Sequence, residues 1–96
     1  MKGNTVLDFR GEGEGTGIDA AGTVTGNYVA RSQLAGMQIG QGSTVIGNTS
    51  MNNDGPLGGI VVSCPSNVTD NTAVNNAGGN LVLNGNGCNN TNNVAP

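Results

Sequence analysis

The chain has 96 residues, of which three are basic and six acidic, so its net charge is −3 and only 9% of its residues are charged. It contains 18 glycines, one tyrosine, one phenylalanine, and neither tryptophan nor histidine. Three basic residues cannot form a phosphate-binding surface, so neither nucleic acid nor a membrane is an expected partner. Without histidine, a nucleophilic triad lacks its usual base, and we expect no catalytic residues, no metal site and no cofactor.

Short segments that alternate apolar and polar residues recur along the chain in a fixed order. Apolar-led segments begin at Gly17, Gly36, Gly59 and Asn80, spaced by 19, 23 and 21 residues. A second rank of segments starts with Thr-Val or Asn-Val; it comprises 5–6, 23–27, 44–48 and 67–71. A third rank consists of the asparagine pairs 52–53 and 75–76. Three ranks that return in the same order indicate an internal repeat.

A period of about 19–23 residues, with two or three short β-like segments per unit, is typical of one coil of a β-solenoid. Helical spacing of apolar residues is absent. We therefore predict one all-β domain over 1–96, with about four to five stacked coils at 3–83 and a capping tail at 84–96. Like residues would stack about 4.8 Å apart in parallel sheets. The expected inward residues are Ile18, Ala20, Met37, Ile39, Ile60, Val62, Leu81 and Leu83, together with Val6, Val24, Val45 and Val68 of the second rank.

Three asparagines end the second-rank segments and would lie at one corner of successive coils: Asn27, Asn48 and Asn71. Asparagine tolerates the left-handed backbone that a tight corner requires. Stacked asparagine amides also hydrogen-bond along a ladder, as in cross-β structures. We expect a structural role for this corner ladder rather than sugar binding.

The motif Gly-Ile-x-Val, then Thr-Val-x-Gly-Asn, then Asn-Asn resembles the repeats of the right-handed parallel β-helix family. That family includes pectate-lyase-like, periplasmic copper-processing-like and phage tailspike-like proteins. The resemblance extends from about residue 3 to about residue 94 and implies a right-handed parallel β-helix. Members include polysaccharide lyases and hydrolases, epimerases, adhesins and proteins without known activity, so the fold alone does not define the function.

The segment 64–91 resembles the C-terminal end of bacterial secreted members of this family. Cys64 and Cys88 are 24 residues apart, close to one coil, and residues stacked one coil apart have Cα atoms near 5 Å, within disulfide range. We predict a disulfide that ties the last coil to the preceding one; two free thiols are the alternative. A disulfide implies an oxidising compartment, so we expect the parent protein to be secreted or at the cell surface, although no signal peptide is recognisable.

The acidic residues do not suggest a catalytic cluster. Asp8 and Asp70 would lie three coils apart, roughly 15 Å, which is too far for a glycosidase carboxylate pair. Asp19 should point outward, near Arg10 or Arg31, and we name Asp19 and Arg31 as weak candidate binding residues. The other charged candidates, Glu12 and Glu14, lie in a glycine-rich segment without the spacing of a calcium loop. A threonine ladder of Thr5, Thr23 and Thr44 would resemble an ice-binding surface, but Ile46 and Asn67 interrupt it.

The expected function is that of a non-catalytic structural or carbohydrate-contacting module. A solenoid exposes unpaired strand edges at its ends. Val6, Leu7 and Phe9 look like part of a coil with one open edge, so we expect a homo-oligomer formed through exposed edges, including the first coil. The alternative is a fragment of an extracellular polysaccharide lyase or hydrolase whose active residues lie outside this chain. A chain made for the study of solenoid folding is a third possibility.

Overall fold

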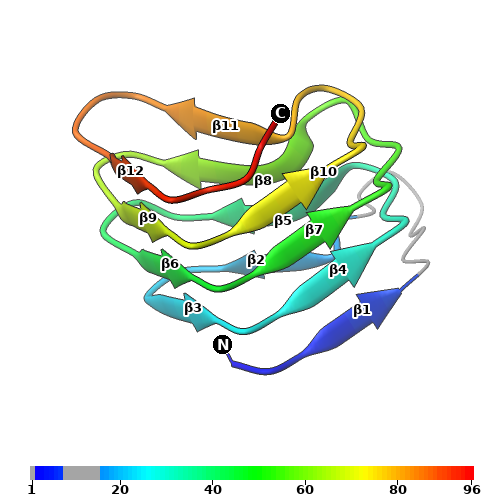
Figure 1. The fold of residues 1–96 in the computed structure, drawn as a ribbon, viewed down its shortest axis with the longest axis horizontal. Helices are drawn as coiled ribbons and strands as arrows, with labels where there is room; N and C mark the ends of the chain where they lie inside the picture. The colour runs from blue at the N-terminus through cyan, green and yellow to red at the C-terminus, as the bar shows by residue number, and fades with distance from the viewer. Residues whose placement is uncertain (1, 8–15) are drawn as a thin grey trace.

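The computed structural model describes residues 2–7 and 16–96, and for 5–7 only the backbone. The described residues form three parallel sheets of four strands and no helix (Figure 1). The β1 sheet contains β1 (Thr5–Leu7), β4 (Tyr28–Ala30), β7 (Thr49–Met51) and β10 (Thr72–Val74). The β2 sheet contains β2 (Ile18–Ala20), β5 (Ala35–Ile39), β8 (Gly58–Ser63) and β11 (Leu81–Asn84). The β3 sheet contains β3 (Thr23–Thr25), β6 (Thr44–Ile46), β9 (Asn67–Thr69) and β12 (Asn89–Thr91).

Consecutive strands belong to different sheets, so every three strands complete one turn of a coil (Figure 1). Three turns are complete: β2 to β4, β5 to β7 and β8 to β10. The chain is therefore an all-β parallel solenoid, as predicted, but it has about three turns rather than four to five. The count is lower because the end turns are partial in the described residues. β1 precedes the first complete turn, and after the third come only β11, β12 and an isolated bridge between Val94 and Thr72.

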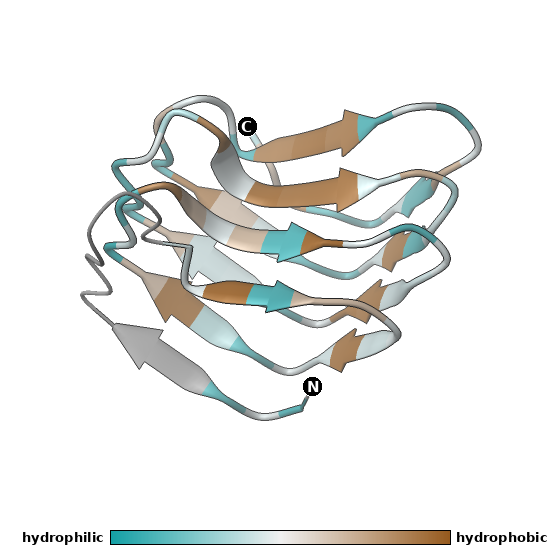
Figure 2. Cartoon of the chain, turned by 180° about the vertical axis from the view of Figure 1, so that it is seen from behind, coloured by the Kyte–Doolittle hydropathy of each residue, from teal (hydrophilic) through white to brown (hydrophobic). Residues whose placement is uncertain are grey.

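The interior consists of apolar side chains stacked from coil to coil, because alternate residues of each strand face inward. Strand register aligns Ile18, Met37, Ile60 and Leu81 in one stack, Ala20, Ile39, Val62 and Leu83 in a second, and Val24, Val45 and Val68 in a third. These stacks are the predicted ones, and the residues in the middle turns are fully buried. In Figure 2 the apolar residues recur at matching places in successive strands.

The placement of the first strand differs from the prediction. Val6 pairs in register with Val29 of β4, so β1 belongs to the β1 sheet and not to the rank of Val24. The reason lies in Gly3-Asn4, which forms the same corner as Gly26-Asn27, so that residues 5–7 follow the corner rather than precede it. Thr5 consequently pairs with Tyr28, and the expected threonine ladder does not include it.

Candidate functional site

The corner between the β3 sheet and the β1 sheet contains a continuous asparagine ladder. Its five members are Asn4, Asn27, Asn48, Asn71 and Asn93. In each of the first four, the backbone N–H and the side-chain Nδ2 both donate to Oδ1 of the asparagine one coil further on, at 2.9–3.0 Å. The three central members are almost completely buried. The amides therefore satisfy polar groups inside the corner, as the structural interpretation predicts.

The left-handed backbone at this corner lies one residue earlier than predicted. None of the three central asparagines has a positive φ; the left-handed residue is the one before each, namely Gly26, Gly47 and Asp70, with φ of 66°, 68° and 57°. The preceding residue makes the turn, and the asparagine that follows is thereby free to direct its side chain into the corner. The Gly-Asn, Gly-Asn and Asp-Asn pairs of the sequence were the available signal.

A second ladder, which we did not predict, lies at the corner that leads into the β2 sheet. The backbone N–H of Ser32 donates to Oδ1 of Asn53 at 2.8 Å, and Asn53 donates to Oδ1 of Asn76 from its N–H (3.1 Å) and its Nδ2 (2.7 Å). Asn76 in turn donates to Oδ1 of Asn80. Each of the first three members follows a left-handed residue, of which Arg31 is one. Arg31 thus occupies the left-handed position of a turn, with φ of 57°.

The predicted disulfide is present between Cys64 and Cys88. The S–S distance is 2.00 Å and the Cα atoms are 5.0 Å apart. Cys64 lies in the turn from β8 to β9, and Cys88 lies in the turn from β11 to β12, one coil further on. The bond therefore joins the last, partial turn to the third complete turn.

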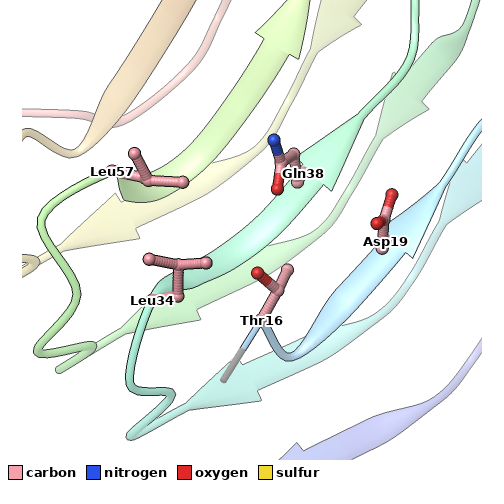
Figure 3. Close-up of a pocket in the computed structure, with 5 residues that line it drawn as sticks. All are labelled: Thr16, Asp19, Leu34, Gln38 and Leu57. Atoms are coloured by element: carbon pink, nitrogen blue, oxygen red, sulfur yellow. The ribbon is translucent and has the colours of Figure 1, made fainter. Parts of the chain in front are cut away.

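The candidate binding site is a hollow of about 440 Å³ on the outer face of the β2 sheet. Among the described residues it is lined by Thr16, Asp19, Leu34, Gln38 and Leu57 (Figure 3). Asp19 pairs in register with Gln38, so a carboxylate and an amide project side by side from adjacent strands, and both are exposed. The side chains of Leu34 and Leu57 come from the loops that precede β5 and β8, and Leu57 is 39% exposed. The hollow therefore combines hydrogen-bonding groups with an apolar wall.

The hollow brings together only part of what the sequence suggested. Asp19 projects outward from β2, where it lines the hollow. Arg31, the other candidate binding residue, lies at the corner after β4 and is not among the described residues that line it. The predictions for Asp8, Arg10, Glu12 and Glu14 lie outside the described residues.

The remaining acidic side chains do not converge on one site. Asp19 lies in β2, Asp54 in the loop after β7, and Asp70 at the corner after β9. Within 2–7 and 16–96, no group of three or more histidine, cysteine, aspartate or glutamate residues is placed to hold a metal ion. In the same part of the chain, no helix is long and apolar enough to cross a membrane.

No protein-family model, curated protein or solved structure matches this chain significantly. The fold class therefore rests on the strand topology and on the repeat itself.

Proposed function

We propose that the chain is a non-catalytic β-helix module with a structural role, and that it contacts carbohydrate through the hollow on the β2 sheet. The observation that carries this proposal is the pairing of Asp19 with Gln38 beside Leu34 and Leu57. Carboxylate and amide groups hydrogen-bond sugar hydroxyls, and leucine side chains pack against the apolar faces of sugar rings. The carboxylate and the amide lie on adjacent coils about 4.8 Å apart, and the next two coils carry Val61 and Val82 at the matching outward position.

We further propose that the coil is right-handed and that the chain is a member of the right-handed parallel β-helix family. Two observations support this. The chain rises from its N-terminus while it passes left to right along the front, through β3 and β4, and right to left behind, through β5 (Figure 1). The segments that begin at Gly17, Gly36, Gly59 and Asn80 overlap the strands of the β2 sheet, those at 23–27, 44–48 and 67–71 contain strands of the β3 sheet, and the asparagine pairs lie at the corners after β7 and β10. The disulfide supports a secreted or cell-surface location.

The test is a titration of the protein with neutral and acidic oligosaccharides, in which the NMR chemical shift of each backbone amide is monitored. We expect the shifts to change around Asp19 and Gln38, and Asp19→Ala or Gln38→Ala to weaken binding about tenfold, the loss of one hydrogen bond to a charged or polar partner. Asp70→Asn is the control, because it removes one negative charge from an exposed corner outside the hollow. Absence of any shift would leave only the structural role, and turnover of an acidic polysaccharide would favour a lyase or hydrolase.

A further inference from the structure

The last strand of the β2 sheet leaves part of the core uncovered. β11 is the edge strand of this sheet, at the C-terminal end of the stack (Figure 1). Leu81 and Leu83 face inward but are only half-buried, whereas their register partners Ile60 and Val62 are fully buried. The difference arises because no described strand lies beyond β11.

The backbone of β11 also has an unpaired side. The N–H of Ile60 donates to the carbonyl of Asn80 at 2.9 Å, and the N–H of Cys64 donates to the carbonyl of Asn84 at 2.8 Å. Alternate residues of a parallel strand direct their backbone groups to opposite sides, so Asn80 and Asn84 face β8. Leu81 and Leu83 therefore direct their N–H and C=O groups to the open side.

The neighbouring part of this end is closed by polar side chains instead. The inward position that valine occupies in β3, β6 and β9 is occupied in β12 by Asn90, whose Oδ1 accepts a hydrogen bond from Nδ2 of Asn93 at 2.6 Å. Nδ2 of Asn80 donates to the carbonyl of Pro96 at 2.7 Å. Apart from Val94, which lies beside β10 and is 55% exposed, the apolar residues of this end that are incompletely covered thus lie mainly on β11.

Charge distinguishes the two ends of the solenoid. Residues 71–96 contain no charged side chain, whereas six of the nine charged residues, two basic and four acidic, lie in 1–19. Natural edge strands are usually protected from pairing by lysine, proline or inward charges, and β11 has none of these. No charged side chain of residues 71–96 would therefore oppose the meeting of two C-terminal ends.

We propose that two copies of this chain associate through β11, with the two strands antiparallel around a two-fold axis. In this pairing Leu81 exchanges backbone hydrogen bonds with Leu83 of the second copy, and the two Val82 side chains lie directly opposite each other on the outer face. In Figure 2 the strands β8 and β11 are apolar along most of their length, whereas β2 and β5 each contain a polar segment. The outward positions in register are Asp19 in β2, Gln38 in β5, Val61 in β8 and Val82 in β11. A two-fold contact of this kind closes after two copies and does not propagate into a fibre.

The contact is small, so the dimer should be weak. The molecule measures 32 × 24 × 21 Å along its principal axes, with the strands stacked along the vertical direction of Figure 1. An end face of this size offers on the order of 500 Å² per copy, near the lower limit for a specific interface. This inference is independent of carbohydrate contact, and either can fail without the other.

The experiment is sedimentation equilibrium of the oxidised chain from about 10 µM to about 1 mM, a range suited to a weak interface. We expect the mass to rise from 9.5 kDa toward twice that value and no further. Val82→Lys places like charges opposite each other and should raise the dissociation constant roughly tenfold. Ser63→Lys is the matched control. Ser63 is exposed on β8, so this substitution adds the same charge one coil away from the edge strand.

A second measurement keeps the proposal testable if Val82→Lys fails to fold. Amide hydrogen exchange of Leu81 and Leu83 in the unmodified chain should slow as the concentration rises, while that of Ile60 stays constant. A mass of 9.5 kDa throughout, with fast exchange at both leucines, would overturn the proposal and leave this edge to a different partner. Masses beyond the dimer, or association that Val82→Lys leaves unchanged, would overturn it as well, because another edge would then be in use.

Discussion

Reduction of the Cys64–Cys88 disulfide should destabilise the chain by a calculable amount. The bond closes a loop of 24 residues along the sequence. Closing a loop of that length in the unfolded chain corresponds to about 3.5 kcal/mol at room temperature on the chain-entropy account. The whole domain is expected to have a free energy of unfolding of roughly 5–14 kcal/mol. The bond therefore supplies a large fraction of the total.

Loss of the bond should destabilise the last turn more than the others, since Leu81 and Leu83 are only half-buried there. Thermal and urea unfolding of the oxidised and reduced protein would measure the change, and we expect the melting temperature to fall by about 15–25 °C. Amide exchange would locate it: the N–H of Asn71, which donates to Asn93 in the last turn, should lose protection more than the N–H of Asn27, which donates to Asn48.

Two results would refute this reasoning. A melting temperature that changes by less than about 5 °C on reduction would show that the bond restricts the unfolded chain far less than its loop length implies. Equal loss of protection at Asn71 and Asn27 would show that the turns unfold as one unit, so that the last turn is not the weak part. Cys88→Ser in the absence of reductant would separate either result from an effect of the reductant itself.

Three further predictions concern single interior positions, each checked by urea unfolding with circular dichroism. Asn48→Ala should lower the free energy of unfolding by about 4 kcal/mol, because it removes the oxygen that accepts two buried hydrogen bonds from Asn27; a loss below about 1 kcal/mol would contradict the ladder's role. Gly36→Ala should lower the free energy of unfolding by about 3 kcal/mol or more, because a Cβ there would overlap the hydroxyl of Ser50. Gly47→Ala should lower it by only about 1 kcal/mol, because a Cβ there meets no atom and only the positive φ is unfavourable. Ser32→Ala should be neutral or stabilise by up to about 1 kcal/mol, because the buried Ser32 hydroxyl has no hydrogen-bond partner in the described part of the chain; clear destabilisation would indicate a partner.

The stacked interior could be predicted because it depends on a simple alternation. The register partners Met37 and Ile60 each follow a glycine at the start of their segments. The structure explains why a larger residue does not fit at these two positions. A Cβ at Gly36 would overlap the side chain of Asn53, and a Cβ at Gly59 that of Asn76, both members of the second ladder. The disulfide was predictable for a related reason, since one coil of separation brings two Cα atoms to bonding distance.

The corners were harder to predict because their geometry depends on which residue makes the turn. We assigned the left-handed backbone to Asn27, whereas Gly26 adopts it. The alignment of residues 5–6 with residues 23–24 was a separate error, which displaced them by one sheet. The pair Gly3-Asn4 contained the information needed for the correct register. The last member of the second ladder, Asn80, could not be predicted from the repeat. It follows Asn76 by only four residues, yet it accepts the hydrogen bond that an asparagine one full coil further on would accept.

The candidate site was only partly predictable for a physical reason. Strand alternation directs Asp19 and Gln38 outward, so the polar half of the hollow follows from the repeat. The apolar half comes from Leu34 and Leu57, which lie in the loops that enter β5 and β8, and loops of different length do not follow the period of the strands.

The two ladders and the disulfide together suggest how the end of the coil is held. In a solenoid each turn is stabilised by its neighbours, so a terminal turn has an interface on one side only and lacks about half of the stacking energy of an internal turn. The last turn here has additional links to the third complete turn: the Cys64–Cys88 bond and the hydrogen bonds from Asn71 to Asn93. These links all act at the corners on either side of β12. The second ladder holds the start of β11 through the hydrogen bonds from Asn76 to Asn80, and the rest of β11 is held by its pairing with β8. The uncovered leucines of β11 are therefore the place where a second copy would add most to stability.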